Sequence, residues 1–595
     1  MKKLLIIPIL LLSILVMASC ELNSSTLNEN TTVLTNTGSD YDYNESITID
    51  EPSVITVTEV EGDFSISTSD GEYLISNNIY TIKKAGTYTL SGKLEGQILV
   101  DAGEDDVVII ELNGVSIIYD LDSPIKAISG SKLEISAKKD TENIIQDERS
   151  AKTVESDSQG EGAISANIDL KLKGSGTLVV SGGYNNGVHT SKDLTIQKLT
   201  LKVTGYNNAI KCKNSVTITS GTIQAYALTG NGIKTDDSDL SSKGKQRGTI
   251  TINGGTIYVD SLRDGLDASY DIIIDETDAE VATQLSIKTG TNSSSYNRST
   301  FKADSEKGLK AANEITINRG TIVIAASDDA IHANYGETLE NGSKGLGNIT
   351  INDGLIQVAS GDDGLHADNT LTVNGGKIVV TGSTEGFEAN YITINGGYSY
   401  IYGTDDGVNC SKKSFNNCAF KMTGGYLDVA VRNGDTDGID SNGSFTLSGG
   451  IIVTRGSSGT NLSGMSTGLD VDGTISMTGG TLIAFNGLEK SPSASSTIKY
   501  AGTTSSNSQM MGGGRGGFFG PRYGGGGSSS SSITLSAGKY TLYGDGLEIS
   551  FTNDYVYGSF QIYSSALTTG STYTLSLNGS TVLSWTQSSN SVTIS

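Results

Sequence analysis

Residues 362–380 decide the fold of this chain, and they read DDGLHADNTLTVNGGKIVV. The stretch holds two phrases. The first is an acidic turn that ends in Gly364 and is followed by an apolar, a polar and a small residue. The second, residues 371–380, places Asn-Gly-Gly between two runs in which apolar and polar residues alternate. Alternation with a period of two is typical of a half-buried β-strand.

Both phrases recur along the chain. The Gly or Ala of the first phrase returns after 21–23 residues, or after 30–43 where a copy carries an insertion, at positions 187, 209, 232, 265, 308, 330, 364, 386, 407, 438 and 468. Asn-Gly-Gly between strands would by itself suggest a hairpin. A hairpin does not explain why three short strands return in every period, whereas the stacked coils of a parallel β-helix do. We therefore predict an all-β fold, a parallel β-helix of about 14 coils of ~22 residues with β-rich terminal caps.

The repeat also predicts the interior and the length of the rod. Inward aliphatic side chains form a continuous core, and corner glycines supply the positive φ that a sharp bend needs. Weaker copies at residues 107–110, 132–135 and 168–172 extend the repeat upstream, and it stops after Phe485. At a strand spacing of ~4.8 Å, the coils would form a rod roughly 65 Å long.

Composition excludes several classes of protein. The chain has 595 residues, with 75 Gly but only 5 Pro, which does not fit collagen. It is rich in β-branched runs, which does not fit disorder. Its net charge of −25 argues against nucleic acid or an anionic membrane surface as the main partner, because both need clustered cations.

The N-terminus predicts the location of the protein. Lys2 and Lys3 precede an apolar run, residues 4–16, that is too short to span a bilayer. Small residues then precede Cys20, an arrangement that resembles the bacterial lipobox, whose thiol carries a lipid. The alternative is an ordinary secretory peptide with an incidental Cys. We expect an extracytoplasmic protein whose membrane contact is this N-terminal lipid, on the bacterial cell membrane or cell surface.

The chain divides into six predicted parts. They are a lipoprotein signal peptide (1–19), a flexible tether (20–50), an N-terminal β cap (51–100), the parallel β-helix (101–486), a Ser/Gly-rich flexible segment (487–532) and a C-terminal β module (533–595) that folds separately or returns to cover the end of the rod. Three cysteines remain beyond Cys20, an odd number that excludes a disulfide framework. Cys410 and Cys418 could pair, or all three could be unpaired thiols.

The first phrase of each coil also carries polar side chains. Its apolar and small residues point inward, so the residue between them points outward. Stacked coils would align these outward residues into one line, here called the polar row: His189, Lys211, Lys234, Asp267, Lys310, His332, His366, Glu388, Asn409, Asp440 and Asp470. All three histidines of the chain fall in it. We therefore predict a functional surface rather than a merely solvated face.

Carboxylates precede the corner residue in successive coils, at Asp329, Asp363, Glu385, Asp406 and Asp437. Stacked ~5 Å apart, neighbouring carboxylates would repel by about 3 kcal/mol at an effective dielectric constant near 20. Protonation of some carboxylates, side chains that splay into water, or a bound cation would relieve this repulsion, and Ca²⁺ takes six to eight oxygen ligands. We predict Ca²⁺ ligands among Asp264, Asp267, Asp328, Asp329, Asp362, Asp363, Asp405, Asp406, Asp437 and Asp440. The alternative is that Asp merely favours a turn before Gly.

Insertions follow the outward strand of the first phrase in three coils, at residues 235–247, 334–347 and 411–417. They would form one wall beside the polar row, and long loops on a rigid scaffold are a common place for binding. Tyrosines are spread over the coils at positions 184, 206, 258, 398, 400, 402 and 426. Such side chains stack on sugar rings or belong to ordinary sheet structure.

Several phrases together resemble one known group. They are AGTYTLSG at 85–92, the repeated Asp-Asp-Gly/Ala-apolar-His, Asn-Gly-Gly at 374–376, DGID at 437–440 and the Met/Gly-rich residues 510–517. The chain resembles bacterial secreted or lipid-anchored carbohydrate-binding domain-containing proteins with a pectate-lyase-like, right-handed parallel β-helix. The resemblance implies binding of Ca²⁺ and of polysaccharides such as cellulose or polygalacturonate, without an established catalytic role.

The sequence thus predicts a surface-anchored, calcium-dependent, non-catalytic protein that binds an acidic or cellulosic polysaccharide and no nucleic acid. The predicted glycan contacts are Lys211, Lys234, Lys310, His332, His366 and Glu388. One alternative is a calcium-dependent polysaccharide lyase, in which Lys310 would be the base. Another is a structural adhesin of the cell envelope, for which the rod alone would matter.

Overall fold

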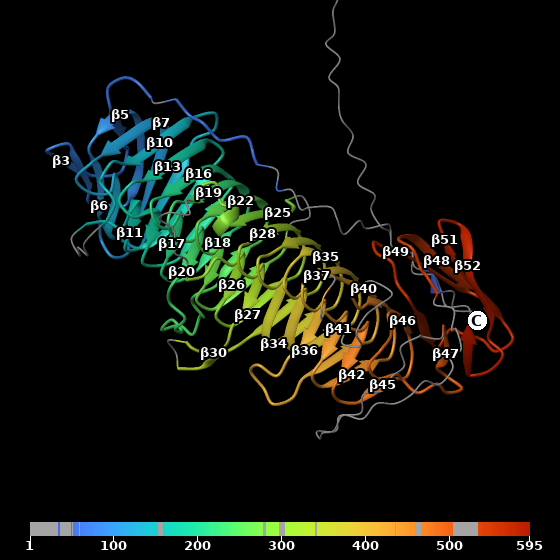
Figure 1. The fold of residues 1–595 in the computed structure, drawn as a ribbon. Helices are drawn as coiled ribbons and strands as arrows, with labels where there is room; N and C mark the ends of the chain where they lie inside the picture. Colours follow the sequence, from blue (N-terminus) through green and yellow to red (C-terminus); the bar gives the residue numbers. More distant parts are fainter. Residues whose placement is uncertain are drawn as a thin grey trace, which may run out of the picture.

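The computed structural model describes residues 34–35, 49, 51–58, 60–152, 159–277, 281–296, 304–339, 342–432, 434, 436–457, 466–503 and 533–594. In Figure 1 the strands stack side by side into one long rod, which runs from the blue N-terminal strands to the red C-terminal ones. No α-helix is assigned in the described ranges, and accordingly none of them contains a helix able to cross a bilayer. The predicted signal peptide, Cys20 and residues 504–532 lie outside the described residues.

Each coil contributes strands to three faces of the rod, and the strands of each face pair in parallel. Face 1 comprises β8 (Ile125–Ser129), β11 (Gly162–Ala166), β14 (Asn186–Thr190), β17 (Ile210–Cys212), β20 (Ile233–Thr235), β23 (Leu266–Ala268), β26 (Leu309–Ala311), β29 (Ile331–Ala333), the first halves of β34 (Leu365–Val373) and β36 (Phe387–Ile394), β38 (Val408–Cys410), β41 (Ile439–Ser441) and β44 (Leu469–Val471).

Face 2 follows face 1 in each coil. It comprises β9 (Lys132–Ala137), β12 (Asp169–Gly174), β15 (Leu194–Gln197), β18 (Val216–Ile218), β21 (Ile250–Ile252), β24 (Asp271–Ile274), β27 (Glu314–Ile317), β32 (Asn348–Ile351), the second halves of β34 and β36, β39 (Ala419–Met422), β42 (Ser444–Leu447) and β45 (Ile475–Met477).

Face 3 completes the coil. It comprises β10 (Glu142–Asp147), β13 (Thr177–Gly182), β16 (Leu199–Gly205), β19 (Gly221–Ala227), β22 (Gly255–Ser261), β25 (Thr283–Thr289), β28 (Thr321–Ala325), β33 (Leu355–Ala359), β35 (Lys377–Gly382), β37 (Tyr398–Gly403), β40 (Tyr426–Val431), β43 (Ile451–Arg455) and β46 (Thr481–Phe485).

This pairing is that of a parallel β-helix and confirms the all-β prediction. Each strand pairs with the equivalent strand of the next coil, so Ile331 lies beside Leu365 and Leu365 beside Phe387. A hairpin would have paired Leu371–Val373 with the strand that follows it. The number of coils, the right hand of the helix, the caps and the domain boundaries stay predictions.

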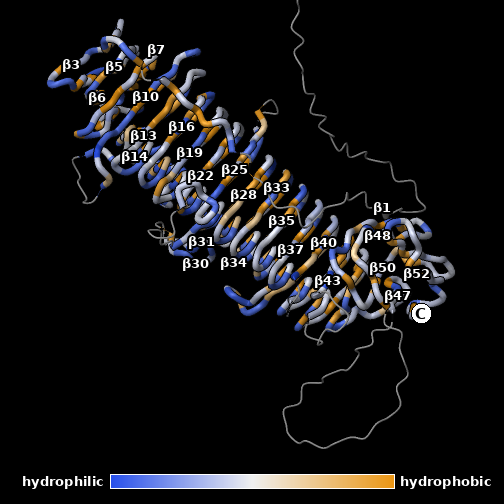
Figure 2. Tube along the Cα trace, turned by 45° about the horizontal axis from the view of Figure 1, so that its top comes forward, coloured by the Kyte–Doolittle hydropathy of each residue, from blue (hydrophilic) through white to orange (hydrophobic). Residues whose placement is uncertain are grey.

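The core runs the length of the rod, as the alternation in the sequence requires. Inward residues such as Ile331, Leu365 and Phe387 are fully buried. In Figure 2 hydrophobic and hydrophilic positions alternate along the stacked strands, with orange and blue segments in adjacent coils lying side by side. Because the coils offer aliphatic side chains at equivalent positions, the inward hydrophobic residues of the described coils form one continuous cluster from coil to coil.

The N-terminal strands mix antiparallel and parallel pairing. They are β2 (Ser65–Ser67), β3 (Tyr73–Ser76), β4 (Ile79–Ile82), β5 (Gly86–Glu95), β6 (Gln97–Asp101) and β7 (Val107–Tyr119). The β2–β5 and β3–β4 pairs are antiparallel, whereas β5–β7 and β4–β6 are parallel. Residues 51–58 run along the rod and reach face 3, where the Gln224 side chain bonds to the backbone of Ser53 and Ile55.

The C-terminal strands return to the last coil. They are β47 (Lys499–Thr503), β48 (Gly538–Gly544), β49 (Leu547–Asn553), β50 (Phe560–Ser564), β51 (Thr572–Leu577), β52 (Ser580–Thr586) and β53 (Ser591–Ile594). Strand β50 pairs antiparallel with both β46 and β47. The short β1 (Leu34–Thr35) pairs with β49, β30 (Tyr335–Thr338) pairs with β31 (Lys344–Leu346), and η1 (Gly290–Asn292) is a single 3₁₀ turn.

The two kinds of corner glycine have different physical roles, which corrects part of the prediction. Gly376, in the second phrase, has a φ of 81°, as predicted for a sharp bend. Gly364, in the first phrase, is not among the residues with positive φ. A Cβ at Gly364 would instead lie 2.5 Å from the Gly386 carbonyl oxygen. Glycine is needed there because the next coil packs too closely for a side chain.

Candidate functional site

The polar row forms as predicted. In the register of face 1, His189 pairs with Lys211, and each following member pairs with the next: Lys234, Asp267, Lys310, His332, His366, Glu388, Asn409, Asp440 and Asp470. Residues that are far apart in the chain therefore stand in neighbouring coils. The register brings together all six predicted glycan contacts and Asp267 and Asp440 of the predicted Ca²⁺ ligands.

The row points away from the core but is more covered than the sequence suggests. Most of its members are half-buried, Asp267 is buried, and Glu388 has no exposed surface. Glu388 is covered by residues 411–417, where Ser411 Oγ donates to Oε1 at 3.1 Å and Lys413 Nζ to Oε2 at 2.5 Å. An outward direction in a strand therefore does not guarantee exposure where a loop folds over the row.

The three insertions lie beside the row, as predicted. The insertions at 334–347 and 411–417 touch each other, with the rings of Tyr335 and Phe415 4.6 Å apart. The insertion at 235–247 reaches the other end of the row, where Asp236 Oδ2 lies 2.8 Å from Lys211 Nζ. Together they form a wall along one side of the polar row.

Each of three carboxylates that precede the corner uses one oxygen to accept a hydrogen bond from the backbone of the next coil. Asp329 Oδ1 accepts a hydrogen bond from the backbone N–H of Asp363 at 3.0 Å, and Asp363 Oδ1 accepts one from Glu385 at 3.2 Å. Asp406 Oδ1 likewise accepts from Asp437 at 2.8 Å. These contacts explain why short acidic side chains recur in the turn. The second oxygens of Asp329 and Asp363 face His332 and His366 of the row.

Lysines in the N-terminal part of the row bind acids of neighbouring coils. Lys234 Nζ donates to Asp267 Oδ2, which also accepts from Asn231 Nδ2 at 3.0 Å. Burial lowers the pKa of Lys234, but the carboxylate of Asp267 outweighs it and raises the pKa overall. Lys310 Nζ lies 3.7 Å from Asp264 Oδ2. Two predicted Ca²⁺ ligands, Asp264 and Asp267, therefore already have cationic partners.

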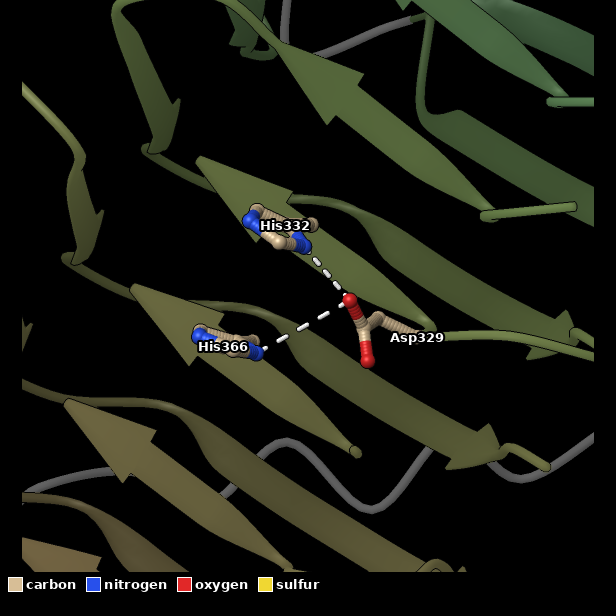
Figure 3. Close-up of side chains that lie close together, drawn as sticks. All are labelled: Asp329, His332 and His366. Carbon is tan, nitrogen blue, oxygen red and sulfur yellow. Dashed lines mark hydrogen bonds and ion pairs between the residues drawn. The ribbon is translucent and has the colours of Figure 1, made fainter. Parts of the chain in front are cut away.

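His332 and His366 occupy the middle of the row and stack on each other, with ring centroids 4.4 Å apart and 15° between the planes. Figure 3 shows the Nδ1 edges of both rings turned toward the Asp329 carboxylate. Asp329 Oδ2 lies 2.5 Å from His332 Nδ1 and 3.8 Å from His366 Nδ1. Burial would raise the pKa of Asp329, but the hydrogen bond and charge of His332 hold it well below its usual range.

Further carboxylates surround His366. Its Nδ1 lies 2.9 Å from Asp363 Oδ2 and 3.3 Å from Glu388 Oε2, and its Nε2 lies 3.3 Å from Asp368 Oδ1. Burial would lower the pKa of His366, but the hydrogen bonds to Asp363 and Asp368 raise it to about 10. Burial and the neighbouring Glu388 raise the pKa of Glu385 to about 8. Acidic groups thus outnumber the imidazoles here.

The C-terminal part of the row consists of oxygen donors. Burial, followed by the charges of Asp440 and Asp437, raises the pKa of Asp406 to about 7. Burial and the charge of Asp470 raise the pKa of Asp440 to about 7. Among the residues that the structure describes, none of the ion pairs involves Asp406, Asp440 or Asp470. Asp406 and Asp440 are predicted Ca²⁺ ligands, and their carboxylate oxygens are the kind of donor that a calcium ion prefers.

The other predicted residues fall at the edges of the row. Asp328 Oδ1 lies 2.8 Å from Lys307 Nζ, while Asp362 and Asp405 are exposed. Oxygens of Asp328, Asp329 and Asp362 lie within 4.8 Å of one another. Cys212, Cys410 and Cys418 are buried free thiols, so the pairing of Cys410 with Cys418 does not occur.

Sequence reasoning missed three charged residues that complete the centre of the row: Lys307, Asp368 and Lys413. A signal for Asp368 was present, because it follows His366 by two positions and therefore points to the same side of the strand. Lys413 lies in an insertion, whose course the repeat does not specify.

A protein-family model described as "Carbohydrate-binding domain-containing protein" matches residues 76–347 and 343–436, more than half of the chain. The chain belongs to this family. The match confirms the resemblance drawn from the sequence, and it covers the polar row as far as residue 436. Binding of carbohydrate is therefore the activity that the family supports.

One curated relative carries the same description and comes from Acetivibrio thermocellus. It is 33% identical over 139 residues, which cover 23% of this chain and 46% of the relative. The chain thus spans about half the length of that relative. Among solved structures, a polysaccharide lyase-like protein from C. thermocellum, in a gadolinium derivative, is 28% identical, with 43% of this chain and 91% of the other covered. The TM-score is 0.34, which is too low to carry an argument.

Proposed function

We propose that this carbohydrate-binding chain holds an acidic or cellulosic polysaccharide along the polar row, with the help of Ca²⁺ and without cleaving it. The observation that carries the proposal is the unbroken register of eleven polar side chains on face 1. A polysaccharide is a linear polymer, so a straight row of repeated polar groups matches its shape.

The two ends of the row suit an acidic glycan in different ways. In the N-terminal part of the row, Lys211, Lys234 and Lys310 each lie against an aspartate, which a sugar carboxylate would replace as the partner of the ammonium group. At the C-terminal end, the oxygen donors Asp406 and Asp440 would repel a carboxylate unless a cation lay between them. A calcium ion held there supplies the positive charge that bridges the two sets of oxygens.

Anchoring is part of the same proposal. Cys20 would carry the lipid, and residues 21–50 would separate it from the folded chain. Substitution Cys20→Ser is expected to release the protein from the cell membrane fraction into the medium or the periplasm. Unchanged membrane association of this variant would contradict lipid anchoring.

Retention on insoluble polysaccharide tests the binding function. The full chain is incubated with calcium-crosslinked polygalacturonate and with cellulose, in Ca²⁺, in EDTA, and in EDTA followed by excess Ca²⁺. We expect retention on at least one glycan that EDTA abolishes and Ca²⁺ restores, and we expect Asp440→Asn to weaken it. Asp353→Asn, an exposed carboxylate paired with Arg319, is the matched control.

The same assay separates the alternatives. Retention that EDTA leaves unchanged would contradict the calcium requirement, and no retention on any glycan would favour an adhesin. Release of unsaturated, ultraviolet-absorbing sugar ends would show a lyase and overturn the non-catalytic proposal.

A further inference from the structure

The centre of the polar row differs in donor chemistry from its two ends. Among the described residues, it is there that imidazole nitrogens and carboxylate oxygens come close enough together to share a metal ion: the sets Asp363–His366–Glu388 and Asp329–His332–His366 each have one donor atom per residue within 4.8 Å of the others. Calcium prefers oxygen ligands, whereas imidazole suits zinc and other transition metals. The centre therefore does not fit the ion proposed for the C-terminal end.

The spacing around His366 matches a small tetrahedral ion. Zinc bonds to nitrogen and oxygen are about 2.0–2.2 Å long, which places neighbouring ligands of a tetrahedron roughly 3.3–3.5 Å apart. His366 Nδ1 lies 2.9 Å from Asp363 Oδ2 and 3.3 Å from Glu388 Oε2. Asp329 Oδ2 lies 3.8 Å from the same nitrogen. Shifts of a few tenths of an ångström would bring these atoms to ligand spacing.

The fold holds these atoms in place before any ion binds. Asp363 Oδ1 accepts the N–H of Glu385, which leaves Oδ2 directed at His366. The two strands that carry His366 and Glu388 are paired in register. A site built on paired strands loses little conformational entropy when a ligand binds.

The second nitrogen of His366 supplies independent support. Its Nε2 lies 3.3 Å from Asp368 Oδ1, and Asp368 Oδ2 is fixed by the backbone N–H of Tyr335 at 2.8 Å. Histidines that bind metal almost always donate their other N–H to a carboxylate or carbonyl, which fixes the tautomer and orients the ring. Asp368 is in the position of such a partner.

We propose that Asp363, His366 and Glu388 form a binding site for a divalent transition-metal ion such as Zn²⁺. Asp329 is within reach as a fourth ligand, and Asp368 orients His366 from behind. Lys413 Nζ, 2.5 Å from Glu388 Oε2, occupies the place of a cation and competes with the ion. This site is separate from the calcium ion of the proposed function and extends beyond it.

Titration of the EDTA-treated full chain with ZnCl₂ in a calorimeter tests the site, with CoCl₂ as a spectroscopic probe. We expect one saturable Zn²⁺ site, from which millimolar Ca²⁺ does not displace the Zn²⁺ ion. Bound Co²⁺ should show the visible absorption bands that are typical of a low coordination number. His366→Ala and Asp363→Asn should abolish binding, and Asp368→Asn should weaken it by about 10–100-fold. Lys413→Met should strengthen it, because the competing ammonium group is gone.

His189→Gln is the matched control, since it removes an imidazole from the same row outside the site. Unchanged Zn²⁺ affinity in folded His366→Ala, or complete displacement of Zn²⁺ by Ca²⁺, would overturn the proposal. If His366→Ala does not fold, the anomalous X-ray signal of Zn²⁺ in crystals of the unaltered protein tests the site instead. A peak away from His366, or no peak, would contradict the site. Loss of Zn²⁺ binding with intact calcium-dependent glycan retention would leave the proposed function standing.

Discussion

At the scale of single residues, the polar row depends on side chains that serve two neighbours at once. Asp329 bonds through Oδ1 to the backbone of the next coil and through Oδ2 to His332. His332 is therefore held by a carboxylate whose other oxygen is fixed to the next coil. This part of the row is held in place without a disulfide, since the cysteines of the described part of the chain are free.

The free energy of unfolding should depend on pH through one residue of the row, His189. Burial, followed by the charge of Lys211, lowers the pKa of His189 to about 4. The unfolded chain titrates this ring near pH 6.5, so between pH 6.5 and 4 it binds a proton that the folded chain does not. The free energy of unfolding should fall as the pH falls through this window and should not depend on His189 above it.

Urea unfolding of the wild type and of His189→Gln at pH 7 and pH 4.5 measures the effect. The wild type should lose up to about 3 kcal/mol more than the variant between the two pH values. An equal loss in both proteins would show that His189 is not a buried neutral imidazole. The other groups near this ring, Glu161, Asp236 and Lys152, are unchanged in the comparison.

The close packing around the corner glycines leads to a second prediction for single residues. A Cβ on Gly386 would clash with Ile401 Cγ2 and lie 2.6 Å from the Gly407 carbonyl oxygen. Gly386→Ala should therefore lower the free energy of unfolding by about 1–3 kcal/mol through overpacking. Gly382→Ala is the control, because a Cβ there meets no atom within 4 Å. Equal stabilities of the two variants in thermal unfolding would contradict the close packing of the coils.

At the scale of elements, one arginine fastens the C-terminal strands to the rod. Arg455, at the end of β43, is fully buried and its guanidinium bonds to Asp428 of β40 and to Asn553 Oδ1 of β49, the latter at 2.6 Å. It also donates to the Thr552 carbonyl oxygen at 2.8 Å. Arg455 thus joins strands that are nearly one hundred positions apart in the sequence.

Removal of this contact should weaken the attachment of the C-terminal strands, which the pairing of β50 with β46 still holds to the rod. Arg455→Ala leaves the Asp428 carboxylate buried without its partner, so we expect a loss of about 3–5 kcal/mol in the free energy of unfolding. The exposed pair Arg319–Asp353, 3.7 Å apart, is the control, and Arg319→Ala should cost less than about 1 kcal/mol. Chemical denaturation of both variants measures the difference. Similar losses would contradict the role of Arg455.

At the scale of the whole molecule, the register could be predicted because the repeat leaves little choice. A shift of one residue would turn Ile331 and Leu365 outward and His332 and His366 into the core, so burial fixes the pairing. The period alone therefore located the polar row. The positive φ of Gly376 also followed from the phrase that contains it.

Other features depend on segments that do not repeat. The coverage of Glu388 depends on Lys413 and Ser411, whose insertion has no counterpart in the adjacent coils. The burial of Tyr400 and Tyr426 depends on the C-terminal strands packing on face 3, so these tyrosines are structural rather than exposed platforms for sugars. Tyr398 and Tyr206 alone among the predicted tyrosines are largely exposed in the described chain.

Glycan retention by variants of two different faces tests the central claim, that the polar row is the binding surface. The row variant combines Lys211→Ala, Lys310→Ala and Asp440→Asn. The control combines Lys421→Ala on face 2 with Asp353→Asn in the turn that follows β32 of the same face. We predict that the row variant binds its polysaccharide at least about tenfold more weakly, a loss of ~1.4 kcal/mol or more, while the control binds like the wild type. Equal retention of the two folded variants would contradict the account.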